Sequence, residues 1–516
     1  MRNNISAKEI GFQNGPKPYW IASTRTTEYP SLDKDITVDT VIVGGGIVGS
    51  TCAYLLKQAG QRVAIIEANR LAHGTSGHTT AKITSQHGLI YAKLIKHLGR
   101  EKAQQYAEAN QSAIGFIAKL VLDIGIDCDF SRQPAYIYTQ SDGYLKQIES
   151  EITAALDLGI EADYIKELPL PLEIKAAERF VNQAQFHPGK YILALAKRIQ
   201  DDNSYIYENT RAIDFHEGNP CTLITENGKQ VKADNMIIAS HFPAYGSHGN
   251  YFARMYPERS YALGLQIGSS FPRGMYLSAE NPSRSLRATP YGDGELVIIA
   301  GEKHKTGQNS NTNQYYKNLI DFAQQTYEVI DIPFRWSAQD YTTLDEVPYI
   351  GRITAKSPNI YVATGFRKWG MSNGIVSALI LTDLITKGEN PWAKVYDPAR
   401  FVVDPMIKNF TTSNITVAKH LIGDKLKTHP KEVELSPGQA DIIAHEGTKI
   451  GVYRDTHGKL HSVNIVCTHM GCDLAWNEAE LSWDCPCHGS RFSYTGDIME
   501  GPALKSLRTD EIRFNP

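Results

Sequence analysis

Two short segments near the C-terminus each pair a cysteine with a histidine, and they restrict the possible folds more than any other feature of the sequence. The first contains Cys467-Thr-His469, and the second contains Cys485-Pro-Cys-His488. A centre that binds one iron through two thiolates and another through two imidazoles needs two loops that each supply one cysteine and one histidine. The spacing therefore predicts a metal site with Cys467, His469, Cys485 and His488 as ligands.

The pattern around these ligands also bears on the identity of the metal. Four cysteines and two histidines in this region could form a tetrahedral zinc site. A zinc ribbon more often shows two C-x-x-C knuckles, whereas this region shows C-x-H and C-x-x-H. The pattern favours a [2Fe–2S] cluster, with zinc as the alternative.

The sequence around the two segments resembles the Rieske proteins of respiratory and photosynthetic cytochrome bc complexes. The resemblance covers residues 431–516, where short strands separated by turns predict a small all-β module. It implies that Cys472 and Cys487 form a disulfide between the two cluster loops. It also implies that Gly501-Pro-Ala503 forms a proline loop that covers the cluster.

One position departs from the respiratory Rieske pattern. Phe492 stands where that pattern has a tyrosine, two residues after a retained serine, Ser490. A hydroxyl donor to the cluster region is therefore missing, unless Tyr494 reaches round to replace it.

The rest of the chain has the size and composition of several globular domains. Its 516 residues suffice for two to four domains, and its 53 basic and 56 acidic residues give a net charge of −3. This balance predicts no nucleic-acid partner. The N-terminus lacks a basic region followed by an apolar run, and no uninterrupted apolar stretch is long enough to span a bilayer. We expect a cytoplasmic protein without a membrane span.

A glycine-rich turn between a strand and a helix predicts a dinucleotide site. The strand Thr37–Val43 leads into the G-x-G-x-x-G motif at residues 44–49, and a helix from Val48 to Gln58 follows. In this context the glycines permit a tight turn, close approach of a pyrophosphate, and close packing of helix on strand. A second strand, Arg62–Glu67, ends on a carboxylate placed to accept the ribose hydroxyls.

Two further segments, Gly74–Lys82 and Ala363–Gly374, resemble the flavin-contacting parts of the D-amino-acid oxidase and glycine oxidase superfamily. The resemblance extends over residues 38–400 and implies an α/β (α+β) fold, with a Rossmann-like FAD-binding domain and an antiparallel-sheet substrate domain. Residues 261–300 contain no cysteine that could tether the flavin, so we expect FAD to bind non-covalently. The expected FAD-binding residues are Gly44, Gly46, Ile47, Val48, Gly49, Glu67, Ala68, Thr75, Ser76, Thr79, Thr80, Ala81, Arg211, Ala212, Gly365, Gly370, Met371, Ser372 and Gly374.

The same resemblance implies hydride transfer from a carbon next to an amine nitrogen to the flavin, a step for which the cofactor carries the reactivity. Lys82 and His78 lie where it places the flavin face, and they are the candidate catalytic residues, with Lys82 ranked first. Arg367 and Lys368 flank the last glycine-rich turn and could hold a substrate carboxylate or the flavin. For each of these cations, a solvated surface charge or a buried structural role is the competing interpretation.

These observations divide the chain into four parts. Residues 1–36 form an N-terminal extension, which we expect to pack on the surface. Residues 37–400 form the FAD-dependent oxidoreductase domain, residues 401–430 a linker, and residues 431–516 the Rieske domain.

The combination predicts an enzyme, an FAD-dependent oxidoreductase that oxidises a small amine or amino acid and passes electrons singly to the Rieske cluster. An unidentified acceptor protein or a quinone would take them onward. A Rieske oxygenase is one alternative, but the chain lacks the D-x-x-H-x-x-x-x-H pattern of a mononuclear iron site. The other is a redox sensor or electron-transfer flavoprotein that turns over no small molecule.

Overall fold

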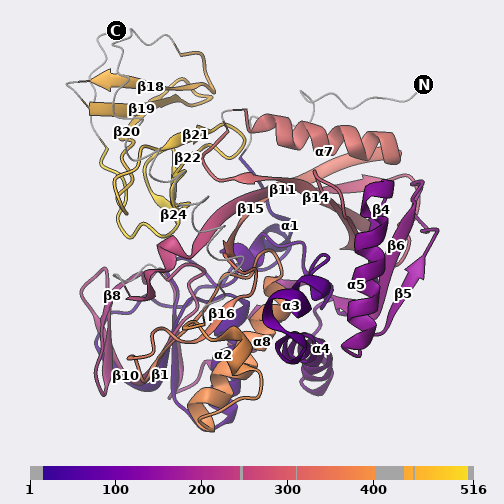
Figure 1. Cartoon of the computed structure of the whole chain (residues 1–516). Coiled ribbons are helices and arrows are strands. Elements are labelled where there is room, and N and C mark those ends of the chain that lie inside the picture. The colour runs from indigo at the N-terminus through magenta and orange to yellow at the C-terminus, as the bar shows by residue number, and fades with distance from the viewer. Residues whose placement is uncertain (1–14, 244–247, 310, 401–434, 446–447, 510–516) are drawn as a thin grey trace.

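The computed structural model describes residues 15–243, 248–309, 311–400, 435–445 and 448–509 (Figure 1). The first large sheet contains the predicted dinucleotide unit. Its strands are β1 (Ile36–Val43), β2 (Val63–Ile66), β7 (Tyr205–Tyr207), β8 (Ala212–His216), β9 (Cys221–Thr225), β10 (Gln230–Ile238), β16 (Tyr349–Arg352) and β17 (Ile360–Thr364). The main order is β16-β17-β10-β1-β2-β7. Because β1 pairs in parallel with both β10 and β2, its carboxyl end lies at a crossover point, where such sheets bind ligands.

Helices pack beside this sheet and bury most of their apolar residues. The glycine-rich turn opens α2 (Ile47–Gln58), which contacts α6 (Pro188–Ile199) and α8 (Gly370–Thr386). The neighbouring helices are α3 (Tyr91–Leu98), α4 (Arg100–Asp123) and α9 (Ala393–Tyr396). The predicted strand–helix–strand unit is therefore present, with boundaries within a residue or two of those expected.

The second large sheet is almost entirely antiparallel. Its strands are β3 (Lys82–Ile83), β4 (Ser131–Thr139), β5 (Ala162–Ile165), β6 (Ala176–Gln185), β11 (Met255–Ile267), β12 (Met275–Ser278), β13 (Arg284–Tyr291), β14 (Gly294–Lys305) and β15 (Val329–Thr343). The order is β15-β11-β14-β13-β12-β4-β6-β3, with β5 beside β6. All pairs are antiparallel except β12 with β4. α7 (Asn313–Thr326) packs on β11 and β14, and α5 (Leu145–Asp157) packs on β5 and β6.

Most of the described part of the N-terminal segment runs along the surface, but a few buried side chains anchor it. Its short helix α1 (Tyr19–Ala22) buries Tyr19 and Trp20, and the Trp20 indole donates a hydrogen bond to the carbonyl of Thr79, 2.6 Å away. Leu32 is also fully buried. What the polar composition of the segment did not indicate is this anchoring, which comes from a few large apolar side chains that gain most from burial in the core.

The C-terminal region consists of two small antiparallel sheets, in agreement with the predicted all-β module. One sheet contains β18 (Ala440–His445), β19 (Thr448–Arg454) and β20 (Leu460–Asn464), and the other contains β21 (Ala475–Asn477), β22 (Ser482–Asp484), β23 (Arg491–Ser493) and β24 (Ile498–Glu500). The module lies against the edge of the second large sheet formed by β11 and β15 (Figure 1). The linker expected at residues 401–430 lies outside the described residues. In the part of the chain that the structure describes, no helix is long and apolar enough to cross a membrane.

Candidate functional site

A cavity of about 710 Å³ lies at the carboxyl end of β1 and is lined from both large sheets. Most of the residues expected to bind FAD line it, namely Gly44, Gly46, Ile47, Val48, Glu67, Ala68, Thr75, Ser76, Thr79, Thr80, Arg211, Ala212, Gly370 and Met371. They come from segments that are far apart in the sequence. The fold thus brings the separate FAD-binding segments to one place.

The glycine-rich turn leaves no room for side chains. Gly44 has a φ of +109°, and a Cβ on it would lie 2.6 Å from the carbonyl oxygen of Ala239. A Cβ on Gly49 would lie 1.9 Å from the carbonyl oxygen of Gly44, so this glycine lets α2 pack against the turn. Gly46 caps the helix and lines the cavity. The backbone at the start of α2 is therefore open to a ligand, and its N–H groups and helix dipole suit a pyrophosphate.

Glu67 follows β2 and lines the same end of the cavity. Its two carboxylate oxygens accept hydrogen bonds from the backbone N–H groups of Gly45, at 2.7 Å, and Asn69, at 2.8 Å. Burial raises the pKa of Glu67, while these hydrogen bonds and Arg211 oppose that rise. The carboxylate is thus held in one orientation, with lone pairs left to accept ribose hydroxyls.

The remaining expected FAD-binding residues do not line the cavity. They are Gly49, Ala81, Gly365, Ser372 and Gly374. Ser372 instead forms a hydrogen bond of 2.9 Å with Nε2 of the buried His87. A Cβ on Gly374 would lie 2.8 Å from Cγ2 of Ile47, so this glycine allows α8 to approach α2. The contribution of these residues to the site is packing rather than direct lining.

Lys82 lines the cavity and is buried. Its ammonium group donates hydrogen bonds to the carbonyl of Tyr276, 3.2 Å away, and to the hydroxyl of Ser285. Burial, together with the nearby Arg287, lowers the pKa of Lys82 to about 7. This side chain can therefore be a neutral amine near neutral pH and accept a proton.

His78 also lines the cavity, but its surroundings favour a structural role. Its Nδ1 donates a hydrogen bond of 2.9 Å to the carbonyl of Gly74, which fixes the ring on its own loop. Its backbone carbonyl accepts a hydrogen bond from the Trp336 indole. Burial lowers the pKa of the imidazole, so it is neutral at pH 7.

Two acidic residues and a serine in the cavity were not singled out from the sequence. Glu258 and Ser260 on β11 and Asp340 on β15 line it, and Glu258 lies opposite Asp340 in the sheet register. The ammonium group of Lys368 donates to the Ser260 hydroxyl. Burial raises the pKa of Asp340, and Lys368 opposes that rise. The sequence feature that could have indicated them is strand alternation, which places residues 258 and 260 on one face of β11.

Arg367, the other cation flanking the last turn, is already paired. Its guanidinium lies 2.6 Å from a carboxylate oxygen of Glu346, although the side chain also lines the cavity. Lys368 is half-buried and hydrogen-bonded to a neutral hydroxyl, with the carboxylates of Glu258 and Asp340 nearby.

The four expected metal ligands lie together in the C-terminal domain. Cys467 and Cys485 are buried free thiols that share a hydrogen bond, which lowers the pKa of Cys467 to about 6 and raises that of Cys485. The ring centroids of His469 and His488 are 5.2 Å apart. In the described part of the chain, the Nδ1 atoms of both histidines are buried without a hydrogen-bond partner. Two adjacent thiols and two unsatisfied imidazole nitrogens fit a [2Fe–2S] cluster with two iron environments.

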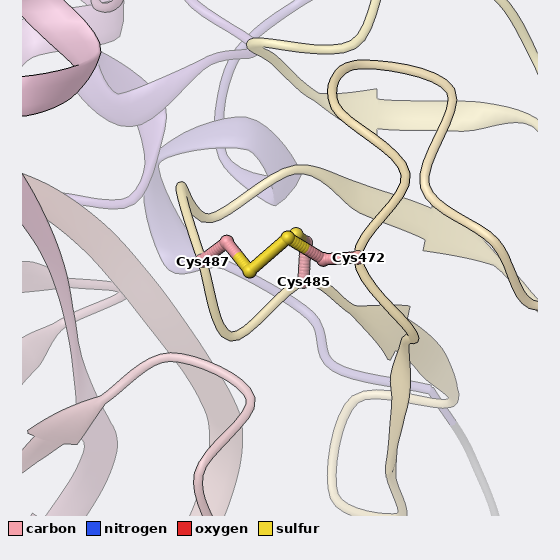
Figure 2. A group of neighbouring side chains, drawn as sticks. All are labelled: Cys472, Cys485 and Cys487. Carbon is pink, nitrogen blue, oxygen red and sulfur yellow. A yellow bond between two sulfur atoms is a disulfide. The ribbon is translucent and has the colours of Figure 1, made fainter. Parts of the chain in front are cut away.

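Cys472 and Cys487 form a disulfide with an S–S distance of 2.02 Å, the pair that the resemblance implied. Figure 2 shows this bond next to Cys485, and the sulfur atoms of the three cysteines lie within 4.8 Å of one another. Because two of these sulfurs are bonded to each other, only Cys485 in this group can act as a thiolate ligand. The disulfide therefore joins the two ligand loops without competing for the metal.

The structure shows whether Tyr494 replaces the tyrosine hydroxyl that is missing at position 492. Phe492 is fully buried in the domain core. Tyr494 packs instead against Tyr453 and His461, with centroid distances of 5.1 and 4.9 Å. Tyr494 thus packs on the β19–β20 side of the domain and does not stand in for a hydroxyl at position 492.

The strand pair β11 and β15 stands between part of the cavity and the His488 loop. On β11 and β15, Glu258 and Asp340 face the cavity, whereas Arg259 and Gln339 face the C-terminal domain. The Gln339 amide donates a hydrogen bond of 2.8 Å to the carbonyl of Gly489, next to the ligand His488. Strand alternation thus assigns opposite faces of the same wall to the two sites.

Glu500 links the two domains through charge. Its carboxylate lies 3.2 Å from the guanidinium of Arg259 and 2.8 Å from that of Arg491. Glu500 is half-buried, and these arginines hold its pKa at about 2, against the effect of desolvation. Glu500, Gly501 and Ala503 also line the same cavity as the glycine-rich turn, so the C-terminal domain closes part of it.

Both imidazoles face aromatic rings of the flavin-side domain. The ring centroids of His469 and Phe242 are 6.4 Å apart, and those of His488 and Phe252 are 5.8 Å apart. Phe242 also lines the cavity. The histidine edge of the cluster site therefore points toward the flavin site.

Two family models match this chain in succession. The FAD dependent oxidoreductase model matches residues 39–384, and the Rieske [2Fe-2S] domain model matches residues 427–511. The Bacillus subtilis protein named "Putative Rieske 2Fe-2S iron-sulfur protein YhfW" is 43% identical over 513 residues, which cover 99% of this chain and 100% of that protein. Both domains are therefore present in a relative of full length.

More distant similarities cover the first domain. The gamma-glutamylputrescine oxidoreductase of Escherichia coli is 22% identical over 390 residues, which cover 71% of this chain and 88% of that protein. The crystal structure of glycine oxidase from Geobacillus kaustophilus superposes with a TM-score of 0.59 at 18% identity, covering 72% of this chain and 99% of that one. At this identity the superposition shows a shared fold.

Proposed function

This chain belongs to the FAD dependent oxidoreductase family, and from that premise we propose that it oxidises a small amine or amino acid and passes the electrons one at a time to its own Rieske cluster. It is an oxidoreductase whose two domains bind FAD and a [2Fe-2S] cluster. The names of two similar proteins, glycine oxidase and gamma-glutamylputrescine oxidoreductase, support the substrate class. The expected consequence is that two-electron chemistry is converted into one-electron delivery.

The shared wall between the two sites is the observation that carries this proposal. Residues of the C-terminal domain, among them Glu500 and Gly501, line the same cavity as the glycine-rich turn. The residues around the cavity would hold an FAD, which would supply hydride acceptance, and the two ligand loops would hold a cluster, which would supply one-electron acceptance. The histidine edge of the cluster site faces Phe242 and Phe252, and Phe242 also lines the cavity, so the two sites share this aromatic side chain.

On the flavin side, we assign separate tasks to the ends of the cavity. Gly44, Gly46 and the first turn of α2 hold the pyrophosphate, and Glu67 accepts the ribose hydroxyls. The N-terminus of α8, at Gly370 and Met371, presents its positive dipole end to the flavin ring. We expect the flavin to be released by acid precipitation, because no covalent tether is expected.

Lys82 is our candidate for the proton-accepting residue. Its lowered pKa leaves it neutral above about pH 7, and it lines the cavity. As a neutral amine it can take a proton from the substrate ammonium, which frees the nitrogen lone pair before the C–H bond is broken. His78 is the second candidate, with its Nδ1 committed to Gly74.

On the cluster side, we assign Cys467 and Cys485 to one iron and His469 and His488 to the other. The Cys472–Cys487 disulfide braces the two loops. The electron acceptor beyond the cluster is a one-electron partner, either a protein or a quinone.

A panel of amines added without oxygen to the purified holoprotein tests this function. Glycine, L-proline and gamma-glutamylputrescine are the probes, and the flavin and cluster absorption bands are recorded together. We expect at least one probe to bleach both bands. If no probe bleaches the flavin while dithionite reduces both centres, the protein acts as an electron carrier without small-molecule turnover. The His469→Ala variant is the control, since its flavin should bleach with no cluster response.

A further inference from the structure

Tyr341 on β15 connects one cluster loop, that of His488, and the expected proline loop to the flavin side of the molecule. Its side chain is buried, and its hydroxyl donates to the carbonyl of His488, 2.9 Å away, and lies 3.2 Å from the carbonyl of Gly501. The first carbonyl belongs to an expected iron ligand and the second to the expected proline loop. One hydroxyl of the oxidoreductase domain thus reaches both segments that enclose the cluster site.

The ring of Tyr341 also contacts residues that line the FAD-binding cavity. Its centroid lies 4.9 Å from that of His241 and 4.9 Å from that of Phe242. Both of these residues line the cavity, and Phe242 lies against the ligand His469. Tyr341 therefore stands in contact with the walls of both redox sites at once.

The cluster domain itself offers a hydroxyl at Ser490, which accepts a hydrogen bond of 3.0 Å from the backbone N–H of Ala503. At position 492 the side chain is phenylalanine, and the hydroxyl-bearing ring of Tyr494 packs against Tyr453. A phenolic hydroxyl reaches the ligand loop from the other domain, through Tyr341.

We propose that Tyr341 is a positioning residue for the cluster, which holds the His488 loop and the Gly501 loop against the flavin site and stabilises the reduced cluster. The hydrogen end of its O–H dipole points at the ligand loop, so it favours the extra negative charge that one electron brings. This inference deepens the proposed function, because it explains how a cluster in one domain is kept at a fixed place and a suitable potential beside a flavin in another.

The test compares two conservative variants of the full-length holoprotein. Tyr341→Phe removes the hydroxyl but keeps the ring. Tyr316→Phe is the matched control, because the buried Tyr316 hydroxyl also crosses the domain boundary, donating at 2.8 Å to Glu480, a residue outside both ligand loops. The cluster's reduction is followed by titration with dithionite, monitored by its electron paramagnetic resonance signal. This measurement needs no amine substrate, so it is independent of whether the proposed amine oxidation is found.

We expect Tyr341→Phe to shift cluster reduction to lower potential, with the equilibrium constant for reduction falling about three- to tenfold, the effect of one hydrogen bond. Tyr316→Phe should leave it unchanged. Failure of Tyr341→Phe to assemble a cluster, while Tyr316→Phe assembles one, would also support a positioning role. An unchanged potential in Tyr341→Phe, or equal effects of the two substitutions, would overturn the proposal, because the hydroxyl would then have no specific role at the cluster.

Discussion

The FAD-binding turn and the cluster loops are built in opposite ways. The turn is one continuous segment, Gly44 to Gly49, in which backbone packs on backbone and a single Cβ would clash. The cluster site is assembled from two loops, joined by the Cys472–Cys487 disulfide and fixed from outside by Tyr341. A site made by local backbone geometry depends on the residues within it, whereas a site made between loops also depends on residues that its sequence motif does not contain.

The largest effect is expected when an imidazole ligand of the cluster is removed. His488→Ala and His469→Ala should each abolish the Rieske electron paramagnetic resonance signal, because each removes one of the two nitrogen ligands expected on one iron. Iron content and the signal are the measurements. A matched control is His461→Ala, because His461 pairs with Asp455 at 2.8 Å, away from the cluster loops. A normal signal in either ligand variant would refute the ligand assignment.

On the flavin side, the largest effect is expected at Lys82. Lys82→Met should lower kcat/KM by about 10²- to 10⁴-fold with the substrate that the amine panel identifies, the usual contribution of a general base. In the wild type, kcat/KM should rise with pH through about 7, because the neutral amine is the active form and burial lowers the pKa of Lys82 to about 7. The variant should lose this rise. A wild-type profile that is flat across this range would contradict the assignment.

The same pKa makes a separate prediction about stability. Between about pH 7 and the ordinary lysine pKa of about 10.4, the unfolded chain binds a proton at Lys82 that the folded chain does not. The free energy of unfolding of the wild type should therefore rise with pH in this window, relative to that of Lys82→Met. Denaturant unfolding of both proteins at several pH values measures the difference. A constant difference across the window would show that Lys82 keeps its proton when buried.

Removal of the Cys472–Cys487 disulfide should have a smaller effect, mainly on stability. Replacing Cys472 and Cys487 together by serine should lower the free energy of unfolding by about 3 kcal/mol, as expected for a disulfide that closes a loop of this length. The cluster should still assemble, because neither residue is an expected ligand, but it should be lost sooner on heating. Absence of iron from the freshly purified variant would show that one of these sulfurs binds the metal.

The smallest expected loss of stability comes from a substitution in the glycine-rich turn at residues 44–49. Gly49→Ala places a Cβ against the Gly44 carbonyl, and overpacking of this kind costs about 1–3 kcal/mol. FAD content after gel filtration should fall together with stability, while the cluster signal is retained. Gly115→Ala is the control, because Gly115 lies in α4 with open space around it, and alanine there should stabilise the helix. Full FAD content in Gly49→Ala would show that the turn can relax.

The contrast also explains how much could be predicted from the sequence. The glycine-rich turn and the Cys/His segments are local motifs, so their residues and spacing are enough to indicate FAD and a cluster. Glu258, Asp340 and Tyr341 could not be found in this way. They meet because β11 pairs with β15 over a long sequence separation, and a local pattern does not determine which face of such a pair meets another domain.

The N-terminal segment also shows what composition cannot predict about packing. Its polar composition predicts a surface course, yet Trp20 is buried and bonded to Thr79 in the flavin-contacting segment. Average composition describes where most side chains go. A few large apolar residues decide where the segment is anchored.

The central claim is that one molecule carries electrons from an amine across the shared wall to its own cluster. Stopped-flow mixing of the holoprotein with a bleaching amine, without oxygen and at several protein concentrations, tests this most directly. We expect the cluster band to fall in a first-order phase that follows flavin reduction and whose rate does not change with protein concentration. A cluster phase whose rate rises in proportion to protein concentration, or a bleached flavin beside an oxidised cluster, would contradict the claim.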